Sequence, residues 1–183
     1  MTTYKEVGAQ AQKNWQFDAP HTLVEFSAKH LMLTTVKGHF TRVSGMLVYD
    51  EADPSRSRVE AEIDAASLST GTVLRDNDLR SAHFLEVEKY PSITFRSTRV
   101  ELLSRDHGQV IGDLTIHGVT REVVLETRLS GRGKNLEGQE VVSFEARTSI
   151  KRKDFGLHWN VVLETGGVLV GDIIGIEIAV ECV

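Results

Sequence analysis

The side chains that most often carry enzyme chemistry are present in this chain, but their spacing forms no recognised motif. The seven histidines lie scattered at positions 21, 30, 39, 83, 107, 117 and 158. No His-x-x-x-His or His-Glu-x-x-His grouping, no Gly-x-Ser-x-Gly elbow and no metal-ligand spacing occurs. The single cysteine, Cys182, stands near the C-terminus on a predicted apolar face, where a thiol is a poor nucleophile. The sequence therefore predicts a protein that is not an enzyme and uses no metal or cofactor.

Five polar residues are candidates for contact with the head group of a bound ligand: His30, Arg75, Asp76, Arg152 and His158. His30 follows an apolar strand-like face, which places it at the end of that strand. Arg75 and Asp76 begin a helical segment, and for Asp76 we favour a helix N-cap over a ligand contact. Arg152 lies in a Lys-Arg-Lys run that either binds a phosphate through its bidentate guanidinium or forms a solvated turn, and we favour the turn.

The length, composition and charge of the chain limit the classes of protein to which it can belong. A chain of 183 residues suits one domain, and 40% hydrophobic residues suffice for a sizeable core. The net charge of −5 argues against a nucleic-acid partner, which favours a basic surface. The first residues lack a secretory pattern, and no stretch approaches the ~18 uncharged apolar residues of a membrane span. We therefore expect a cytoplasmic protein without stable membrane insertion, or a periplasmic one if a signal was removed.

Apolar and polar residues alternate from residue 22 onward, which predicts β-strands. About eight strands are predicted, at residues 22–29, 38–50, 58–64, 92–100, 109–116, 121–129, 141–150 and 172–182. In the second of these the apolar face switches near Ser44-Gly45, as at a bulge or a bend. Residues 73–85 break the alternation and predict a short helix inside a long connection. Residues 1–14 are predicted to be a loose arm or a short surface helix, followed by one domain over residues 15–183.

Eight alternating strands form either a sandwich or a closed barrel, and the pattern alone does not separate the two. Small residues recur on the apolar faces, at Ala28, Ala61, Gly112 and Ala146. Such residues either leave room for a ligand or accommodate large side chains opposite. An eight-stranded barrel has the size at which the interior is either filled or holds one small ligand.

Segments along nearly the whole chain resemble, in order and spacing, the YceI-like family of lipocalin-like proteins. The most specific match is the run GDLTIHGVT at residues 112–120. Further matches are WQFD at 15–18, VEFSAKHL at 24–31, VKGHF at 36–40, RD at 75–76, LRS at 79–81, YPSITF at 90–95, KRKDFG at 151–156 and VGD at 170–172. Any one of these segments is weak evidence, but the ordered set is specific.

The resemblance implies an all-β fold, an eight-stranded antiparallel barrel with an elongated apolar cavity. It also implies one long apolar ligand, such as an isoprenoid quinone, a polyprenyl chain or a fatty-chain molecule, held for transport, storage or sequestration. Members of the family often bind such ligands as homodimers, so the resemblance also implies a possible homodimer. The chain departs from the family at Asp78, where a histidine is common before the helix leucine, and this alters any ligand contact made there.

Inward aromatic and aliphatic side chains are predicted to form the cavity wall, with ordinary core packing as the alternative for each. The wall candidates are Phe26, Ile63, Phe95, Leu114, Leu125 and Phe144. The candidates at the rim and in the connections are Phe40, Leu79, Phe84, Phe155 and Trp159. The alternative functions are a solidly packed barrel that serves as an interaction module and, less favoured, an enzyme with a barrel pocket. The volume of the cavity decides between the carrier and the packed barrel.

Overall fold

Ten strands and one α-helix build the part of the chain that the computed structural model describes, residues 12–183. The strands are β1 (Lys13–His30), β2 (Thr34–Phe40), β3 (Val43–Tyr49), β4 (Arg58–Asp64), β5 (Leu68–Ser69), β6 (Ser92–Leu102), β7 (His107–Ile116), β8 (Val119–Lys134), β9 (Glu140–Lys151) and β10 (Ile173–Cys182). The helix is α1 (Val73–Arg80), and three 3-10 helices are η1 (Pro54–Arg56), η2 (Ala65–Ser67) and η3 (Arg152–Phe155). Of the predicted arm, residues 1–11 lie outside the described residues, and β1 already includes Lys13 and Asn14.

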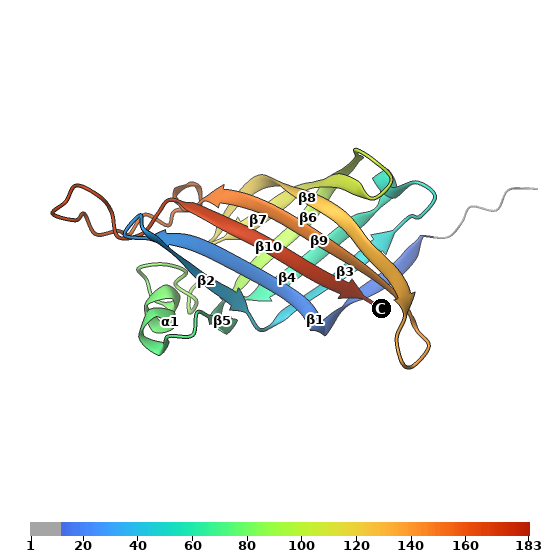
Figure 1. Ribbon diagram of the computed structural model, residues 1–183, viewed down its shortest axis with the longest axis horizontal. Coiled ribbons are helices and arrows are strands. Elements are labelled where there is room, and N and C mark those ends of the chain that lie inside the picture. Colours follow the sequence, from blue (N-terminus) through green and yellow to red (C-terminus); the bar gives the residue numbers. More distant parts are fainter. Residues whose placement is uncertain (1–11) are drawn as a thin grey trace, which may run out of the picture.

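Eight strands close into an antiparallel barrel in the order β1-β3-β4-β6-β7-β8-β9-β10, and β10 pairs with β1 to complete the ring (Figure 1). The two additional strands extend it. β2 lies beside the C-terminal half of β1, in line with β3, and β5 pairs with β2. Closure gives the backbone groups of β1 and β10 a partner that an open sheet edge would lack. The predicted eight-stranded barrel is confirmed, and the sandwich is excluded.

The strand predicted over residues 38–50 is divided at Thr41 and Arg42 rather than bulged near residues 44–45. The Thr41 backbone N–H donates to the Ser67 carbonyl at 3.1 Å, and the Arg42 N–H donates to the Ser67 hydroxyl at 3.1 Å. These contacts with η2 fix the bend. Because of it, β2 turns even-numbered residues to the interior and β3 turns odd-numbered ones.

The helix predicted over residues 73–85 is present but ends at Arg80. The backbone N–H and the hydroxyl of Ser81 both donate to the carbonyl three residues earlier, which terminates the helix. The Arg80 guanidinium donates to the carbonyls of Ala66 and Leu68 at 2.8 and 2.7 Å and so holds α1 against the barrel. Among the described residues no helix is long and apolar enough to cross a membrane.

The barrel has two distinct ends (Figure 1). The helix end, at the left of the picture, carries α1, η3 and the segment 157–171; the turn end carries the connections 50–57, 103–106 and 135–139. Two clusters of buried side chains form the core. The larger cluster includes Phe40, Leu68, Ile93, Leu114, Ile150 and Phe155, and the smaller one consists of Trp15, Tyr49, Val142 and Cys182.

Candidate functional site

An apolar cavity of about 350 Å³ lies inside the barrel. All eight ring strands contribute inward side chains to its wall. On β10 the lining residues run from Ile174 to Cys182, which corresponds to ~26 Å along a strand, so the cavity is elongated. Its volume falls within the range typical of small-molecule sites. The barrel is therefore hollow, which argues against the solidly packed interaction module.

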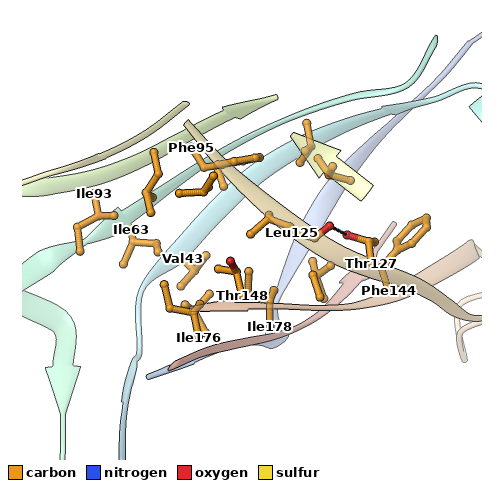
Figure 2. A pocket seen from close by; sticks show the side chains of 18 of the residues that line it. Val43, Ile63, Ile93, Phe95, Leu125, Thr127, Phe144, Thr148, Ile176 and Ile178 are labelled. Atoms are coloured by element: carbon orange, nitrogen blue, oxygen red, sulfur yellow. Dashed lines mark hydrogen bonds between the residues drawn. The ribbon is translucent and has the colours of Figure 1, made fainter. Parts of the chain in front are cut away.

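All six predicted wall residues line this cavity, as do three of the predicted rim residues, Phe40, Leu79 and Phe84. Figure 2 shows how side chains from several strands point into one space, with Ile63 and Phe95 on one side and Leu125, Phe144 and Ile178 on the other. The period-two alternation was enough to find the six wall residues, because every inward position of a ring strand faces the interior. Their contact with a ligand remains a prediction.

The small inward residues divide into two kinds. Ala28, Ala61 and Ala146 line the cavity and leave it open. Gly112 instead accommodates a large neighbour: a Cβ added there would lie 2.6 Å from the Phe95 ring and 2.4 Å from a backbone carbonyl of β6. Both of the alternatives predicted for the small residues therefore occur, the alanines making space and the glycine receiving a ring.

Six predicted site residues lie away from the cavity wall, and four of them are Phe155, Trp159, His30 and His158. Phe155 is buried in the larger core cluster, at 1% exposure, beneath η3. Trp159 packs edge-on against Phe84, with ring centroids 5.3 Å apart, and so backs a lining residue without lining the cavity. His30 and His158 are exposed at the helix end.

Arg152 is not part of a solvated turn, so that prediction is wrong, whereas its contact with the head group of a ligand remains a prediction. Its side chain borders the cavity, is 2% exposed, and donates to the carbonyls of Leu157, Trp159 and Gly171 at 2.7, 2.9 and 3.0 Å. A fourth carbonyl accepts at 3.3 Å. Burial lowers the pKa of the guanidinium, and the Asp172 carboxylate, 3.6 Å away, acts in the opposite direction. The residue ties down the segment that closes the helix end.

Arg75 and Asp76 also have a structural position and do not line the cavity. The N-cap of α1 is Thr72, so the N-cap predicted at Asp76 is wrong. Asp76 is buried inside the helix and accepts hydrogen bonds from the backbone N–H and the hydroxyl of Thr70, at 2.8 and 2.6 Å. Arg75 donates to the same hydroxyl at 2.8 Å. The pair fixes the chain where it enters the helix.

A family model for the YceI-like domain matches residues 15–182. The chain belongs to the YceI-like family. A UPF0312 protein of Staphylococcus aureus strain N315 is 34% identical to it over 169 residues, which cover 92% of this chain and 96% of that relative. The residues matched by the family model span the barrel and include every segment on which the resemblance rests.

Solved structures share the fold of this YceI-like chain. BcnA of Burkholderia cenocepacia gives a TM-score of 0.77 at 22% identity and covers 90% of this chain and 98% of BcnA. The YCEI protein of Campylobacter jejuni gives 0.70 at 29% identity, with 99% and 97% covered. A polyisoprenoid binding domain from Saccharophagus degradans gives 0.67 at 17% identity, with 92% and 97% covered. The lipocalin-like fold expected from the motifs is thereby confirmed.

At its turn end the cavity of this YceI-like domain reaches four exposed polar residues, Arg58, Arg105, Asp106 and His107. His107 Nδ1 lies 2.9 Å from Asp106 Oδ1, and this hydrogen bond lowers the pKa of the Asp106 carboxyl. At the helix end Phe84 is buried, at 8% exposure, whereas Leu79 and Val170 are half-buried. The lining of the cavity is therefore most exposed at the turn end. Sequence reasoning missed these four residues, because they belong to strand ends and a turn without a distinctive motif.

Polar groups are few on the cavity wall. The Thr127 hydroxyl donates to the Leu125 carbonyl at 3.0 Å, the dashed line in Figure 2. The Thr148 hydroxyl faces the same space and has no hydrogen-bond partner within residues 12–183. Cys182 also lines the wall, and burial raises the pKa of its thiol to about 12, so the thiol stays protonated at neutral pH. The wall suits an apolar chain that carries few polar atoms.

One group of side chains among residues 12–183 has donor atoms close enough to hold a metal ion: Asp18, His21 and Glu181, within 4.8 Å of one another. His21 Nδ1 already bonds Asp18 Oδ2 at 2.5 Å, and this hydrogen bond raises the pKa of the imidazole. None of the three lines the cavity. The group therefore adds no chemistry to the candidate site.

Proposed function

We propose that this YceI-like protein binds one long apolar molecule inside its barrel and acts in the carriage, storage or sequestration of that molecule. The ligand class proposed is an isoprenoid quinone, a polyprenyl chain or a fatty-chain molecule. The observation that carries the proposal is the hollow interior, about 350 Å³, walled almost wholly by apolar side chains from every ring strand. The fold is also shared with a structure described as a polyisoprenoid binding domain.

The size of the cavity sets the scale of binding. At the roughly 30 Å³ that a water-sized group occupies in a liquid, about 350 Å³ holds about a dozen such groups. Each buried CH₂ contributes ~0.8 kcal/mol, which gives about 9 kcal/mol before ordering costs are subtracted. That corresponds to affinity near the micromolar range, so an apolar chain needs no charged anchor to remain in the barrel.

The first test is native mass spectrometry of gently purified protein, followed by solvent extraction of any bound material. We expect co-purified mass that leaves with the solvent and is identified as a prenyl or acyl chain. Protein that purifies without ligand, and takes up no quinone, polyprenol or fatty amide on incubation, would refute the proposal.

A blocked variant makes the test specific to the cavity. Ala61 and Ala146 lie on β4 and β9, opposite strands of the ring, so Ala61→Leu with Ala146→Leu narrows the cavity from both sides. Ala179 on β10 is exposed on the outer face, and Ala179→Leu is the matched control. We expect the double variant to lose ligand while the control keeps it. Equal retention by both variants would place the ligand outside the cavity.

A further inference from the structure

Large apolar side chains are exposed on two adjacent turns at the helix end of the barrel. The turn between β1 and β2 exposes Leu31, Met32 and Leu33, the last at 79%, and the segment 157–171 exposes Val161 and Val162, the latter also at 79%. We refer to these five side chains as the apolar rim. The two turns are joined by hydrogen bonds, because the Leu31 N–H donates to the Leu169 carbonyl at 2.9 Å and the Leu169 N–H donates to the Val161 carbonyl at 3.0 Å.

Leu31 and Met32 are unusual residues for the backbone conformation of the first turn. The Leu33 N–H closes the turn on the His30 carbonyl at 3.0 Å, and both central residues have positive φ, +53° at Leu31 and +58° at Met32. Asn-Gly is the stable choice for such a turn, because a side chain at Cβ is strained there. The chain instead places two bulky apolar residues in strained positions and exposes them. Neither feature stabilises an isolated barrel.

The charges around the rim favour an anionic surface. The chain carries a net charge of −5, yet residues 26–49, which include the first turn, contain no Asp or Glu. Of the three basic residues in this stretch, Arg42 pairs with Asp64 and Lys37 with Glu25. Lys29, next to the turn, is exposed, and its ammonium group donates to the Thr35 hydroxyl and forms no ion pair within residues 12–183. Residues 157–171 contain one acid, Glu164. This combination of exposed apolar tips with a flanking lysine is typical of peripheral membrane binding.

We propose that the apolar rim docks reversibly on the surface of a lipid bilayer that contains anionic lipids. The rim consists of the short turn between β1 and β2 and of the longer loop 157–171, which projects from the helix end (Figure 1), whereas a stable protein interface requires about 800 Å² per partner. Projecting tips insert among lipid head groups, which a flat protein partner does not allow. This inference rests on the proposed function, because docking on a bilayer would serve a protein that binds long apolar ligands, and such ligands reside in bilayers.

The rim is continuous with the wall of the cavity. Ala28 precedes the first turn, and Leu157 and Val170 stand at the two ends of the second segment; all three line the cavity. Docking would therefore bring the helix end of the cavity wall close to the bilayer. Arg152 holds the segment 157–171 in place at this end, by hydrogen bonds to the carbonyls of Leu157 and Gly171.

The test is cosedimentation with vesicles of equal parts phosphatidylcholine and phosphatidylglycerol, compared with pure phosphatidylcholine. Leu33→Ser with Val162→Ser removes two rim side chains that make little contact in the fold, and we expect the partition to fall roughly tenfold or more. The matched control is Leu103→Ser with Leu136→Ser at the turn end, where both leucines are exposed as well. We expect the control to sediment like the unaltered protein.

Two charge variants test the electrostatic part. Lys29→Gln should lower the partition onto anionic vesicles about fivefold and leave pure phosphatidylcholine unaffected. Glu164→Gln should raise the partition onto anionic vesicles. The proposal is overturned if the unaltered protein does not sediment with anionic vesicles, or if the control variant loses as much binding as the rim variant. It is also overturned if the rim instead joins two copies, seen as a dimer in light scattering that Leu33→Ser with Val162→Ser converts to monomer without any vesicle binding.

Ligand uptake separates this proposal from the proposed function. The rim variant should take up geranylgeraniol from dilute detergent with unchanged affinity, because the cavity is intact, while its uptake from vesicles becomes slower. Failure to take up any quinone, polyprenol or fatty amide from any source would refute the proposed function, and the vesicle partition would still decide the docking proposal by itself.

Discussion

Replacement of Arg152 by methionine should be among the most damaging single changes to this barrel, although the residue lies in a run that looks like a solvated turn. Its guanidinium is 2% exposed and donates to four backbone carbonyls of the segment 157–171. Methionine fills a similar volume but leaves these carbonyls without their donor. Each hydrogen bond to a charged group contributes about 1.5–3 kcal/mol, and losses of this kind total about 3–5 kcal/mol after relaxation.

The assay is reversible urea unfolding, with thermal melting as a second readout. For a domain of this size, 3–5 kcal/mol corresponds to a fall in Tm of roughly 10 °C. Hydrogen exchange should increase first in residues 157–171. Lys153→Met is the control, since Lys153 is half exposed and its ion pair with Asp172 at 3.2 Å is a surface contact, so we expect a loss below about 1 kcal/mol. A loss for Arg152→Met as small as that of the control would show that the carbonyls find water instead, and the reasoning would fail.

Three further predictions follow from single contacts. Gly112→Ala should destabilise the protein by about 1–3 kcal/mol in urea unfolding, because the added Cβ would lie 2.4 Å from a carbonyl, whereas Gly133→Ala, with nothing within 4 Å, should be nearly neutral. The Cys182 thiol, with a pKa of about 12, should react with a disulfide reagent at pH 8 only after denaturant is added; rapid labelling of folded protein would contradict this. His21 should titrate above its ordinary pKa in an NMR experiment, and Asp18→Asn should lower that pKa. Because the folded pKa is raised, the contact stabilises the fold below the ordinary value and is lost as pH rises through the folded pKa.

The sequence predicted the wall of the cavity well, because a strand that faces a barrel interior must alternate. Phe95 and Leu125 could each be assigned to the interior from their neighbours alone. The closure of the ring could not be derived in this way, since the pairing of β1 with β10 joins residues more than 140 positions apart, such as Phe26 and Ile176. It depended on the family resemblance, and the structure confirmed it.

Polar residues were predicted poorly for a related reason. Alternation says which way a strand side chain points, but it says nothing of how connections fold over the barrel ends. Arg152 lies between two lysines, a pattern that predicts an exposed side chain. The chain that follows nevertheless folds around it, and the carbonyls of Leu157 and Trp159 accept hydrogen bonds from its guanidinium. Arg105 lies in a short turn without a motif, and only the path of the cavity shows that it lines the turn end.

The hollow interior lowers the stability of the barrel, and this cost bears on the function. An unfilled cavity in a protein core lowers the free energy of unfolding by ~24 cal/mol for each Å³ of its volume. A cavity of about 350 Å³ therefore makes this barrel about 8 kcal/mol less stable than a filled barrel of the same topology. This is comparable to the whole stability of a typical domain. Ala61 and Ala146 hold that space open from opposite strands, and larger apolar residues at these positions would fill it. A ligand that binds only the folded barrel recovers part of this free energy by mass action. The alanines are therefore better explained by selection for an occupant than by selection for the stability of the empty barrel.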